Sequence, residues 1–169
     1  MEELKLILIV GPTASGKTAA SIYAAIKLNG EIVSADSIQV YKGMDIGSAK
    51  PTMQERQGIP HHLMDAIDIN SPKFSVAEFR KMAGEAIEDI AGRGKQPIVV
   101  GGTGLYINSL VFPLNFTEVQ SDEKLRSELS EIEERQGRGT LHAMLQEEDP
   151  ESAARLHPND TKRIIRALE

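Results

Sequence analysis

The chain has 169 residues, no cysteine and a formal net charge of −6. Its length is enough for one domain with a sizeable core, and the lack of cysteine excludes disulfides and cysteine-ligated metal sites. The acidic balance disfavours a protein that coats nucleic acid without specificity, although it leaves room for a local basic face. The apolar run near the N-terminus is too short for a signal peptide or a membrane span, so we expect a cytoplasmic protein with no membrane partner.

The first half of the chain alternates short β-rich runs with helical patterns, which is typical of βαβ units around a parallel sheet. Glycine and proline interrupt the stretch from Gln39 to Pro60, which we expect to be a loop. The predicted elements are strands at Leu4–Val10, Glu31–Ser34 and Pro97–Val100 and helices at Lys17–Leu28 and Ser75–Arg93.

The helix at Ser75–Arg93 has the strongest pattern. Ser75 and Glu78 form a capping box, and Gly94 fits the position after the last turn. One apolar stripe runs along the helix and consists of Val76, Phe79, Ala83, Ile87 and Ile90.

After about Leu114 the β-rich runs stop and the pattern becomes helical and acidic. We therefore expect an α/β core over residues 1–114, with an incomplete sheet, and a helical insertion or subdomain over residues 115–169. Helices are predicted at 121–136, 140–147, 151–156 and 159–169, the last with Asn159 as its N-cap. That last helix has no glycine or proline stop, and only three strands are predicted where sheets usually have about five or six, so we expect a fragment.

The segment "GPTASGKT", directly after the first predicted strand, fits the phosphate-loop pattern G-x-x-x-x-G-K-[ST]. Glycines let the backbone wrap around an anion, and the following helix adds the positive end of its dipole. Lys17 is expected to reach terminal phosphate oxygens, and the Thr18 hydroxyl to ligate Mg²⁺, the expected cofactor. The predicted fold is an α/β parallel sheet of the phosphate-loop nucleoside-triphosphate-hydrolase type with helices on both faces. The predicted phosphate-binding residues are Gly11, Pro12, Thr13, Ala14, Ser15, Gly16, Lys17 and Thr18.

Asp36 follows the second predicted strand in "EIVSADSIQVY". The carboxyl ends of parallel strands face one ligand crevice, so Asp36 is expected near the phosphate loop, as a general base on an incoming nucleophile. The alternative is that Asp36 only caps a turn or helix. The strand at Pro97–Val100 runs into "GGTG" with no acidic residue, which disfavours an ordinary ATPase or GTPase.

Four segments in this order resemble bacterial tRNA dimethylallyltransferases: "GPTASGKT", "SADSIQVYKGMDIGSAKP", "VGGTGLY" and "HPNDTKRIIRALE". The resemblance implies a transferase that moves the dimethylallyl group of dimethylallyl diphosphate to a tRNA. The acceptor would be N6 of the adenine 3′ of the anticodon, in tRNAs that read codons beginning with U. The resemblance further implies that Asp36 takes the N6 proton, with Lys17 and Thr18 as the other catalytic residues. Members of the family are longer, which agrees with a fragment, and we expect a monomer.

The resemblance also implies tRNA contacts in both parts of the chain. For Thr103 the alternative is a plain strand-to-helix turn, and for Arg126 it is a surface ion pair. For Lys162, Arg163 and Arg166 the alternative is a solvated helix face; as phosphate contacts they would position the anticodon stem-loop rather than specify it. The implied tRNA-binding residues are Asp36, Ser37, Ile38, Gln39, Thr103, Arg126, Lys162, Arg163, Ile164, Ile165 and Arg166.

Three other functions stay open from the residues alone. A small-molecule kinase would use the same loop, with Asp36 deprotonating an alcohol that attacks a γ-phosphate. An adenylate isopentenyltransferase would transfer the same prenyl group to free nucleotides. A nucleotide-dependent RNA-binding module would bind tRNA without chemistry.

Overall fold

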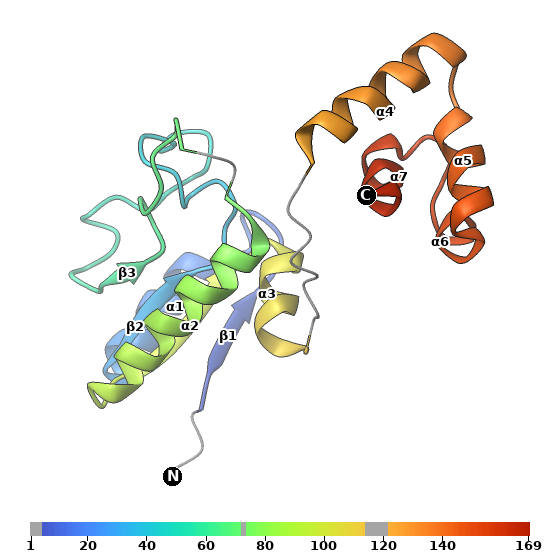
Figure 1. Cartoon of the computed structure of the whole chain (residues 1–169). Coiled ribbons are helices and arrows are strands. Elements are labelled where there is room, and N and C mark those ends of the chain that lie inside the picture. Colours follow the sequence, from blue (N-terminus) through green and yellow to red (C-terminus); the bar gives the residue numbers. More distant parts are fainter. Residues whose placement is uncertain (1–4, 72–73, 114–121) are drawn as a thin grey trace. The chain divides into compact units, whose positions relative to one another are not determined.

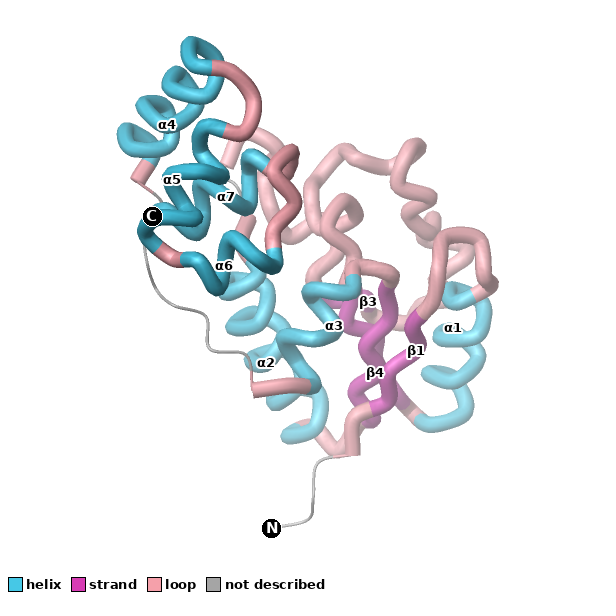
Figure 2. Tube along the Cα trace, turned by 90° about the vertical axis from the view of Figure 1, so that its right-hand side faces the viewer, coloured by secondary structure: helices cyan, strands magenta, loops and turns pink. Residues whose placement is uncertain are grey.

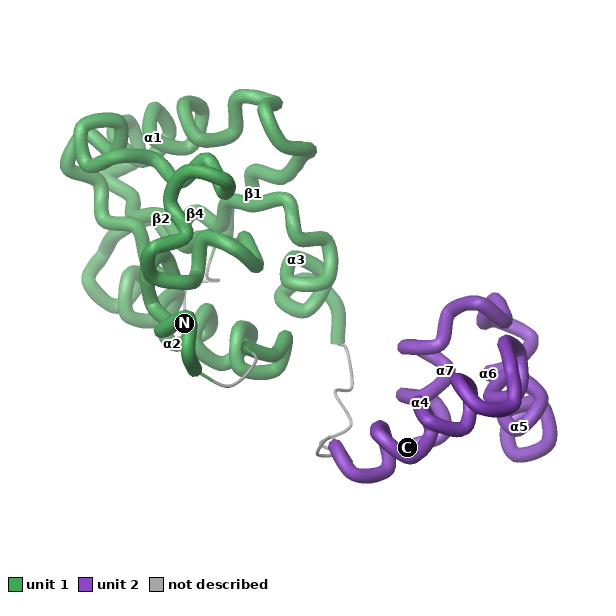
Figure 3. Tube along the Cα trace, turned by 90° about the horizontal axis from the view of Figure 1, so that it is seen from above, with its two compact units in different colours: residues 1–116 green, residues 117–169 purple. Residues whose placement is uncertain are grey.

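The computed structural model describes residues 5–71, 74–113 and 122–169. The chain divides into two compact units, Met1–Phe116 (unit 1) and Thr117–Glu169 (unit 2), which are coloured separately in Figure 3. The expected helical residues before 122 lie outside the described ranges, as does Leu4, the expected start of the first strand. Each unit has its own buried apolar cluster and is described by itself.

Unit 1 is built on a parallel sheet, as the sequence predicts. The strand order is β1-β4-β2-β3, and each neighbouring pair is parallel. Ile32 of β2 lies opposite Ile98 of β4, and Val33 lies opposite Val99. The short β3 was not predicted. The strands are β1 (Ile7–Val10), β2 (Gly30–Ser34), β3 (His61–His62) and β4 (Gln96–Gly101).

Helices cover both faces of this sheet, which confirms the predicted architecture (Figures 1 and 2). Successive strand residues point to opposite faces, so Ile32 and Ile98 pack with Ile22 and Ala25 of the first helix. The next residues, Val33 and Val99, pack on the other face against the second and third helices. These helices are α1 (Lys17–Leu28), α2 (Val76–Gly92) and α3 (Gly104–Val111).

The capping box that the sequence predicts at the start of α2 is present. The Glu78 N–H donates to the Ser75 Oγ, and the Ser75 N–H donates to the Glu78 carboxylate. Phe79 is buried and stacks on Tyr106 of α3 with a centroid distance of 4.0 Å. The apolar stripe of α2 therefore fixes both α2 and α3 against the sheet; its fully buried members are Phe79, Ala83, Ile87 and Ile90.

A buried carboxylate joins the amino ends of β2 and β4. The Glu31 side chain is 3% exposed and accepts hydrogen bonds from Arg93 at 2.6 and 2.8 Å and from Lys95 at 2.7 Å. The His62 Nε2 of β3 lies 2.7 Å from the same carboxylate. The Arg93 guanidinium, together with Lys95 and His62, holds the pKa of Glu31 well below its usual range despite burial. This cluster ties α2, β2, β3 and β4 together at the sheet end opposite the phosphate loop.

Unit 2 is helical, as expected. Its first, third and fourth helices each begin at an aspartate whose side chain accepts backbone N–H groups: Asp122, Asp149 and Asp160. The prediction that Asn159 caps the last helix is wrong by one residue, because Asp160 accepts the Arg163 N–H instead. The helices are α4 (Glu123–Gln136), α5 (Thr140–Glu148), α6 (Pro150–Arg155) and α7 (Thr161–Leu168). Their shared core contains Leu129, Leu141, Leu145, Ala153, Ile164 and Ile165.

Among the described residues, no helix is both long and apolar enough to span a membrane.

Candidate active site

The predicted phosphate loop connects β1 to α1 and ends in a left-handed glycine. Gly16 has a φ of +82° and is the N-cap of α1, and Ala14 also has a positive φ of 63°. Such backbone is readily adopted by glycine and turns the chain sharply into the helix. The Lys17 ammonium donates to the Pro12 carbonyl at 2.6 Å, so this side chain folds back over the loop. The N-terminus of α1, with its unpaired N–H groups and positive dipole end, therefore opens at the loop.

The "GGTG" turn after β4 brings three segments into contact. A Cβ at Gly101 would lie 2.1 Å from the Ala35 carbonyl oxygen, and one at Gly102 would lie 3.1 Å from the Gly11 carbonyl oxygen. Only glycine fits at Gly101, because backbone atoms occupy the space of a side chain. The phosphate loop, the end of β2 and the end of β4 therefore meet at one sheet edge, the edge at which α/β proteins bind ligands.

Asp36 lies at this edge and begins a tight turn. Its Oδ1 accepts the N–H groups of Ile38 at 2.9 Å and Gln39 at 3.1 Å. The capping role that the sequence left open is thus present. Among the described residues no donor contacts Oδ2, so one carboxylate oxygen remains available for a proton. The same side chain can hold the turn with one oxygen and accept a proton with the other.

Ser37 and Thr103 are paired across this edge. The Ser37 N–H donates to the Thr103 Oγ1 at 3.1 Å, and the Thr103 hydroxyl lies 3.4 Å from the Ser37 Oγ. The Thr103 N–H in turn donates to the Ala35 carbonyl. Thr103 is therefore more than a turn residue, because it fixes the segment that carries Asp36 against the end of β4.

Gln39 was predicted to contact tRNA, and in this structure its side chain has another partner. Its Nε2 donates to the Ser48 carbonyl at 2.9 Å. The backbone of Gln39 belongs to the Asp36 turn, so this bond links that turn to residues 44–49. Ile38, from the same predicted group, is 44% exposed.

A cavity of about 550 Å³ lies beside the phosphate loop. One wall is α1 from Thr18 to Ile26, including Ile22 and Tyr23. The opposite wall is the loop around Lys50 and Pro51. The cavity combines apolar and polar walls, which is typical of sites for small organic ligands. The sequence predicts a loop over residues 39–60, but it does not predict that residues 49–57 of this loop line a cavity.

The described residues can bind Mg²⁺ only together with ligands supplied by the substrate and by water. In the described part of the chain, no group of three or more acidic or histidine side chains could hold a metal by itself. Thr18 is the second residue of α1, two positions after the left-handed Gly16, and its hydroxyl can supply one ligand. Mg²⁺ usually keeps waters and takes its other ligands from substrate phosphates, so a single protein hydroxyl is compatible with such a site.

Unit 2 holds the remaining predicted tRNA contacts. Lys162, Arg163 and Arg166 are exposed on α7, with Arg163 3.4 Å from Asp160 and Arg166 2.7 Å from Glu169. Arg126 forms an ion pair, but with a buried partner rather than at the surface: it donates to both carboxylate oxygens of Glu169, whose side chain is 2% exposed, at 2.7 and 3.0 Å. These hydrogen bonds lower the pKa of Glu169 to about 2.

The assignment of Ile164 and Ile165 to a tRNA surface needs correction. Their side chains are 1% and 8% exposed and belong to the core of unit 2. They hold α7 in place, and their side chains cannot also be contact surfaces for RNA. The exposed face of α7 is formed by its basic residues.

The fold is an α/β parallel sheet, and the segment that fits the phosphate-loop pattern meets the ends of β2 and β4 at one edge of that sheet. Residues 39–169 match the IPP transferase family model, and the chain belongs to this family.

Curated relatives agree with the family match. The chain is 57% identical to a tRNA dimethylallyltransferase of Desulfitobacterium hafniense (strain Y51), over 97% of this chain and 52% of the relative. It is 51% identical to one of Caldanaerobacter subterraneus, over 98% of this chain and 52% of the relative. The chain thus spans about half the length of the curated relatives it matches.

Solved structures agree on the fold. A tRNA isopentenylpyrophosphate transferase from Bacillus halodurans matches with a TM-score of 0.66 and 48% identity, over 99% of this chain and 55% of that protein. A eukaryotic dimethylallyltransferase acting on tRNA matches with a TM-score of 0.78 and 39% identity, over 96% of this chain and 40% of that protein. The resemblance drawn from the four sequence segments is confirmed.

Proposed function

We propose that this chain supplies the catalytic core of a tRNA dimethylallyltransferase. The enzyme transfers the dimethylallyl group of dimethylallyl diphosphate to N6 of the adenine 3′ of the anticodon, in tRNAs reading U-starting codons, and releases diphosphate. The observation that carries the proposal is the meeting of the phosphate loop, the Asp36 turn and the "GGTG" turn at one sheet edge, in a chain of the IPP transferase family. A tRNA acceptor makes the cytoplasm the proposed place of reaction, with the protein acting as a monomer.

The phosphate loop holds the leaving group in this reaction. The Lys17 ammonium and the backbone N–H groups of residues 13–18 stabilise the charge that gathers on the departing diphosphate. Mg²⁺, held by Thr18 and diphosphate oxygens, would supply further charge neutralisation. As the C–O bond to diphosphate breaks, its electron pair stays on the diphosphate oxygen.

Asp36 acts on the acceptor. The N6 lone pair forms the new bond to the allylic carbon, and the Asp36 Oδ2 receives the proton that N6 loses. An adenine amine is a weak nucleophile, so orientation and a base both contribute. The adenine must leave the anticodon-loop stack to reach this edge, at a cost of a few kcal/mol. Ser37, Ile38, Gln39 and Thr103 surround its proposed position, and the basic face of α7 contacts tRNA phosphates.

Two substitutions of Asp36 separate its two roles. Asp36→Asn retains an oxygen that can accept the Ile38 and Gln39 N–H groups but cannot act as the base. Asp36→Ala removes both the cap and the base. We expect prenyl transfer by the complete protein to fall about 10²–10⁴-fold in both variants, while dimethylallyl diphosphate still protects the phosphate loop from proteolysis.

The outcomes distinguish the alternatives. Native transfer by Asp36→Asn combined with loss in Asp36→Ala would make Asp36 a cap only. Transfer of the prenyl group to AMP in competition with tRNA would favour the adenylate isopentenyltransferase. ATP turnover without tRNA would favour the kinase.

A further inference from the structure

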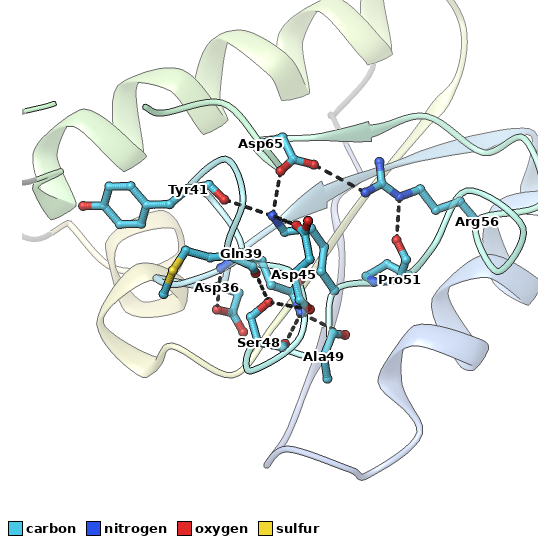
Figure 4. Close-up of polar contacts among 11 residues, drawn as sticks. Asp36, Gln39, Tyr41, Asp45, Ser48, Ala49, Pro51, Arg56 and Asp65 are labelled. Atoms are coloured by element: carbon cyan, nitrogen blue, oxygen red, sulfur yellow. Dashed lines mark hydrogen bonds and ion pairs between the residues drawn. The ribbon is translucent and has the colours of Figure 1, made fainter. Parts of the chain in front are cut away.

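Lys50 is a buried cation whose three donors are all used. Its side chain is 4% exposed, and its ammonium donates to the Tyr41 carbonyl at 2.9 Å, Asp45 Oδ1 at 2.9 Å and Asp65 Oδ1 at 2.6 Å. Figure 4 labels these three partners. Burial opposes the charged form of Lys50, but its bonds with Asp45 and Asp65 outweigh burial and raise its pKa. A buried ammonium with complete coordination fixes the relative positions of its partners.

The partners of Lys50 lie on both sides of it, between residues 41 and 65. Tyr41 follows the Asp36 turn, Asp45 belongs to the next turn, and Asp65 lies beyond β3. The backbone adds four ties between the same segments: residues 65–67 donate three N–H groups to the Gln39 and Val40 carbonyls, and the Lys42 N–H donates to the Ile67 carbonyl. One side chain thus joins three parts of the segment from residue 36 to residue 67.

A second cation extends the same network toward the cavity wall. Arg56 donates from Nε to the Pro51 carbonyl at 3.0 Å, and its Nη2 lies 3.6 Å from Asp65 Oδ2 (Figure 4). Lys50 and Pro51 line the cavity opposite Thr18 of the phosphate loop. Asp65 therefore connects Lys50 to Arg56, which is bonded to Pro51 in the cavity wall.

Gln39 completes the connection to the candidate base. Its backbone N–H donates to Asp36 Oδ1, and its side chain donates to the Ser48 carbonyl, two residues before Lys50. From these contacts we infer that Lys50 is a positioning residue that holds the Asp36 turn and the cavity wall at a fixed place relative to the phosphate loop. The inference rests on the proposed function and deepens it, because it assigns a residue that orients the acceptor without touching diphosphate.

Removal of the ammonium leaves two carboxylates close together without their shared cation. Asp45 and Asp65 then repel, and the turn at 44–49 loses its connection to residues 65–67. The phosphate loop does not depend on the bonds of Lys50, so we expect it to stay intact. The expected result is a base and an acceptor site that are less often correctly placed beside an intact diphosphate site.

The test uses the complete protein and the variant Lys50→Met. We expect kcat for transfer to an anticodon stem-loop to fall at least 10-fold, with KM for dimethylallyl diphosphate unchanged within about twofold. We also expect faster amide hydrogen exchange in residues 36–50 and unchanged exchange in α1. Lys81→Met, which removes an exposed lysine of α2, is the matched control and leaves all three quantities unchanged.

A second variant covers the case in which Lys50→Met does not fold. The triple variant Lys50→Met, Asp45→Asn, Asp65→Asn removes the cation together with both carboxylates, so no unpaired charge remains. It is expected to fold and to keep diphosphate affinity, with a kcat still below that of the wild type.

Several results would overturn the inference. Native kcat in a folded Lys50→Met protein would do so, as would equal loss of kcat and diphosphate affinity, which marks a merely structural role. Failure of the proposed function appears differently, as a wild-type protein that binds dimethylallyl diphosphate but transfers nothing. In that case hydrogen exchange in residues 36–50 of Lys50→Met still tests whether Lys50 holds this segment. Exchange equal to that of the wild type would reject the inference.

Discussion

The two units hold their candidate functional residues by opposite means. In unit 1 these residues lie in loops at the end of a parallel sheet, and contacts between distant segments fix them. In unit 2 the exposed basic candidates Lys162, Arg163 and Arg166 lie along one helix, α7, whose opposite face is part of the core. A local helix therefore places the unit 2 residues, whereas tertiary structure places those of unit 1.

The two units also differ in net charge. Unit 1 has eleven Lys and Arg against twelve Asp and Glu, so it is nearly neutral. Unit 2 has eight against thirteen and carries most of the negative charge of the chain. Any surface for tRNA on unit 2 must therefore be local, and the basic face of α7 fits that requirement.

The largest expected effect tests whether the two cores are separate. Phe79→Ala removes a buried ring that stacks on Tyr106, and we expect unit 1 to lose about 3–5 kcal/mol of stability. Hydrogen exchange resolved by peptide measures this loss in unit 1 while following unit 2 in the same sample. Leu141→Ala is the mirror variant, with an expected loss of about 2–5 kcal/mol in unit 2. If either substitution lowered protection equally in both units, the division into two cores would be wrong.

The second effect compares lysines of the two units. Lys17→Met removes the cation of the phosphate loop, and we expect transfer by the complete protein to fall about 10²–10³-fold. Lys162→Met removes one exposed cation of α7, which at most contacts phosphate, so a loss of only a few fold is expected. Initial rates with saturating stem-loop and varied dimethylallyl diphosphate measure both. A larger loss in Lys162→Met than in Lys17→Met would indicate that the main catalytic cation lies in unit 2.

The third effect concerns the contribution of Glu31 to the acid stability of unit 1. The folded pKa of Glu31 lies below its usual range, so its stabilisation is present above about pH 4.5 and is lost as pH falls through the folded pKa. Glu31→Gln is expected to lower the Tm of unit 1 by roughly 5 °C at pH 7, and to do so progressively less as pH falls below 4. Thermal melts from pH 7 to pH 3 check this prediction. A difference between variant and wild type that stays constant down to pH 3 would show that Glu31 does not carry the effect.

The sequence alone predicts the regular parts of both units well. The bounds of α1 are those predicted, and the capping box of α2 is found at the residues named, because both depend on local patterns. The two-residue β3 could not be predicted, since His61 and His62 form a strand only by pairing with Ile32 and Val33. Short pairing of this kind leaves no periodicity in the sequence.

The candidate site divides in a similar way. The segment that fits the phosphate-loop pattern is local, and it connects a strand to a helix as the sequence predicts. The contacts of Gln39 and Lys50 were not, because their partners lie up to 15 residues away in an irregular loop. The burial of Ile164 and Ile165 could have been predicted, since these residues and Leu168 have the spacing of one helical face. The family resemblance covered the whole segment and did not separate its two faces.

The smallest expected effect tests the one-residue correction in unit 2. Asp160 and Asn159 can both cap a helix, and only Asp160 accepts a backbone N–H of α7, that of Arg163 at 3.4 Å. Asp160→Ala should therefore cost unit 2 about 1 kcal/mol, whereas Asn159→Ala should cost close to nothing. Chemical denaturation followed by hydrogen exchange in α7 measures both variants.

Asp160→Asn separates the cap from the charge, because asparagine keeps the accepting oxygen but loses the ion pair with Arg163. Since exposed pairs contribute little, we expect this variant to stay within about 0.5 kcal/mol of the wild type. A loss as large as that of Asp160→Ala would assign the effect to charge. In that case the ion pair, rather than the cap, would fix the start of α7 and hold its basic face in place.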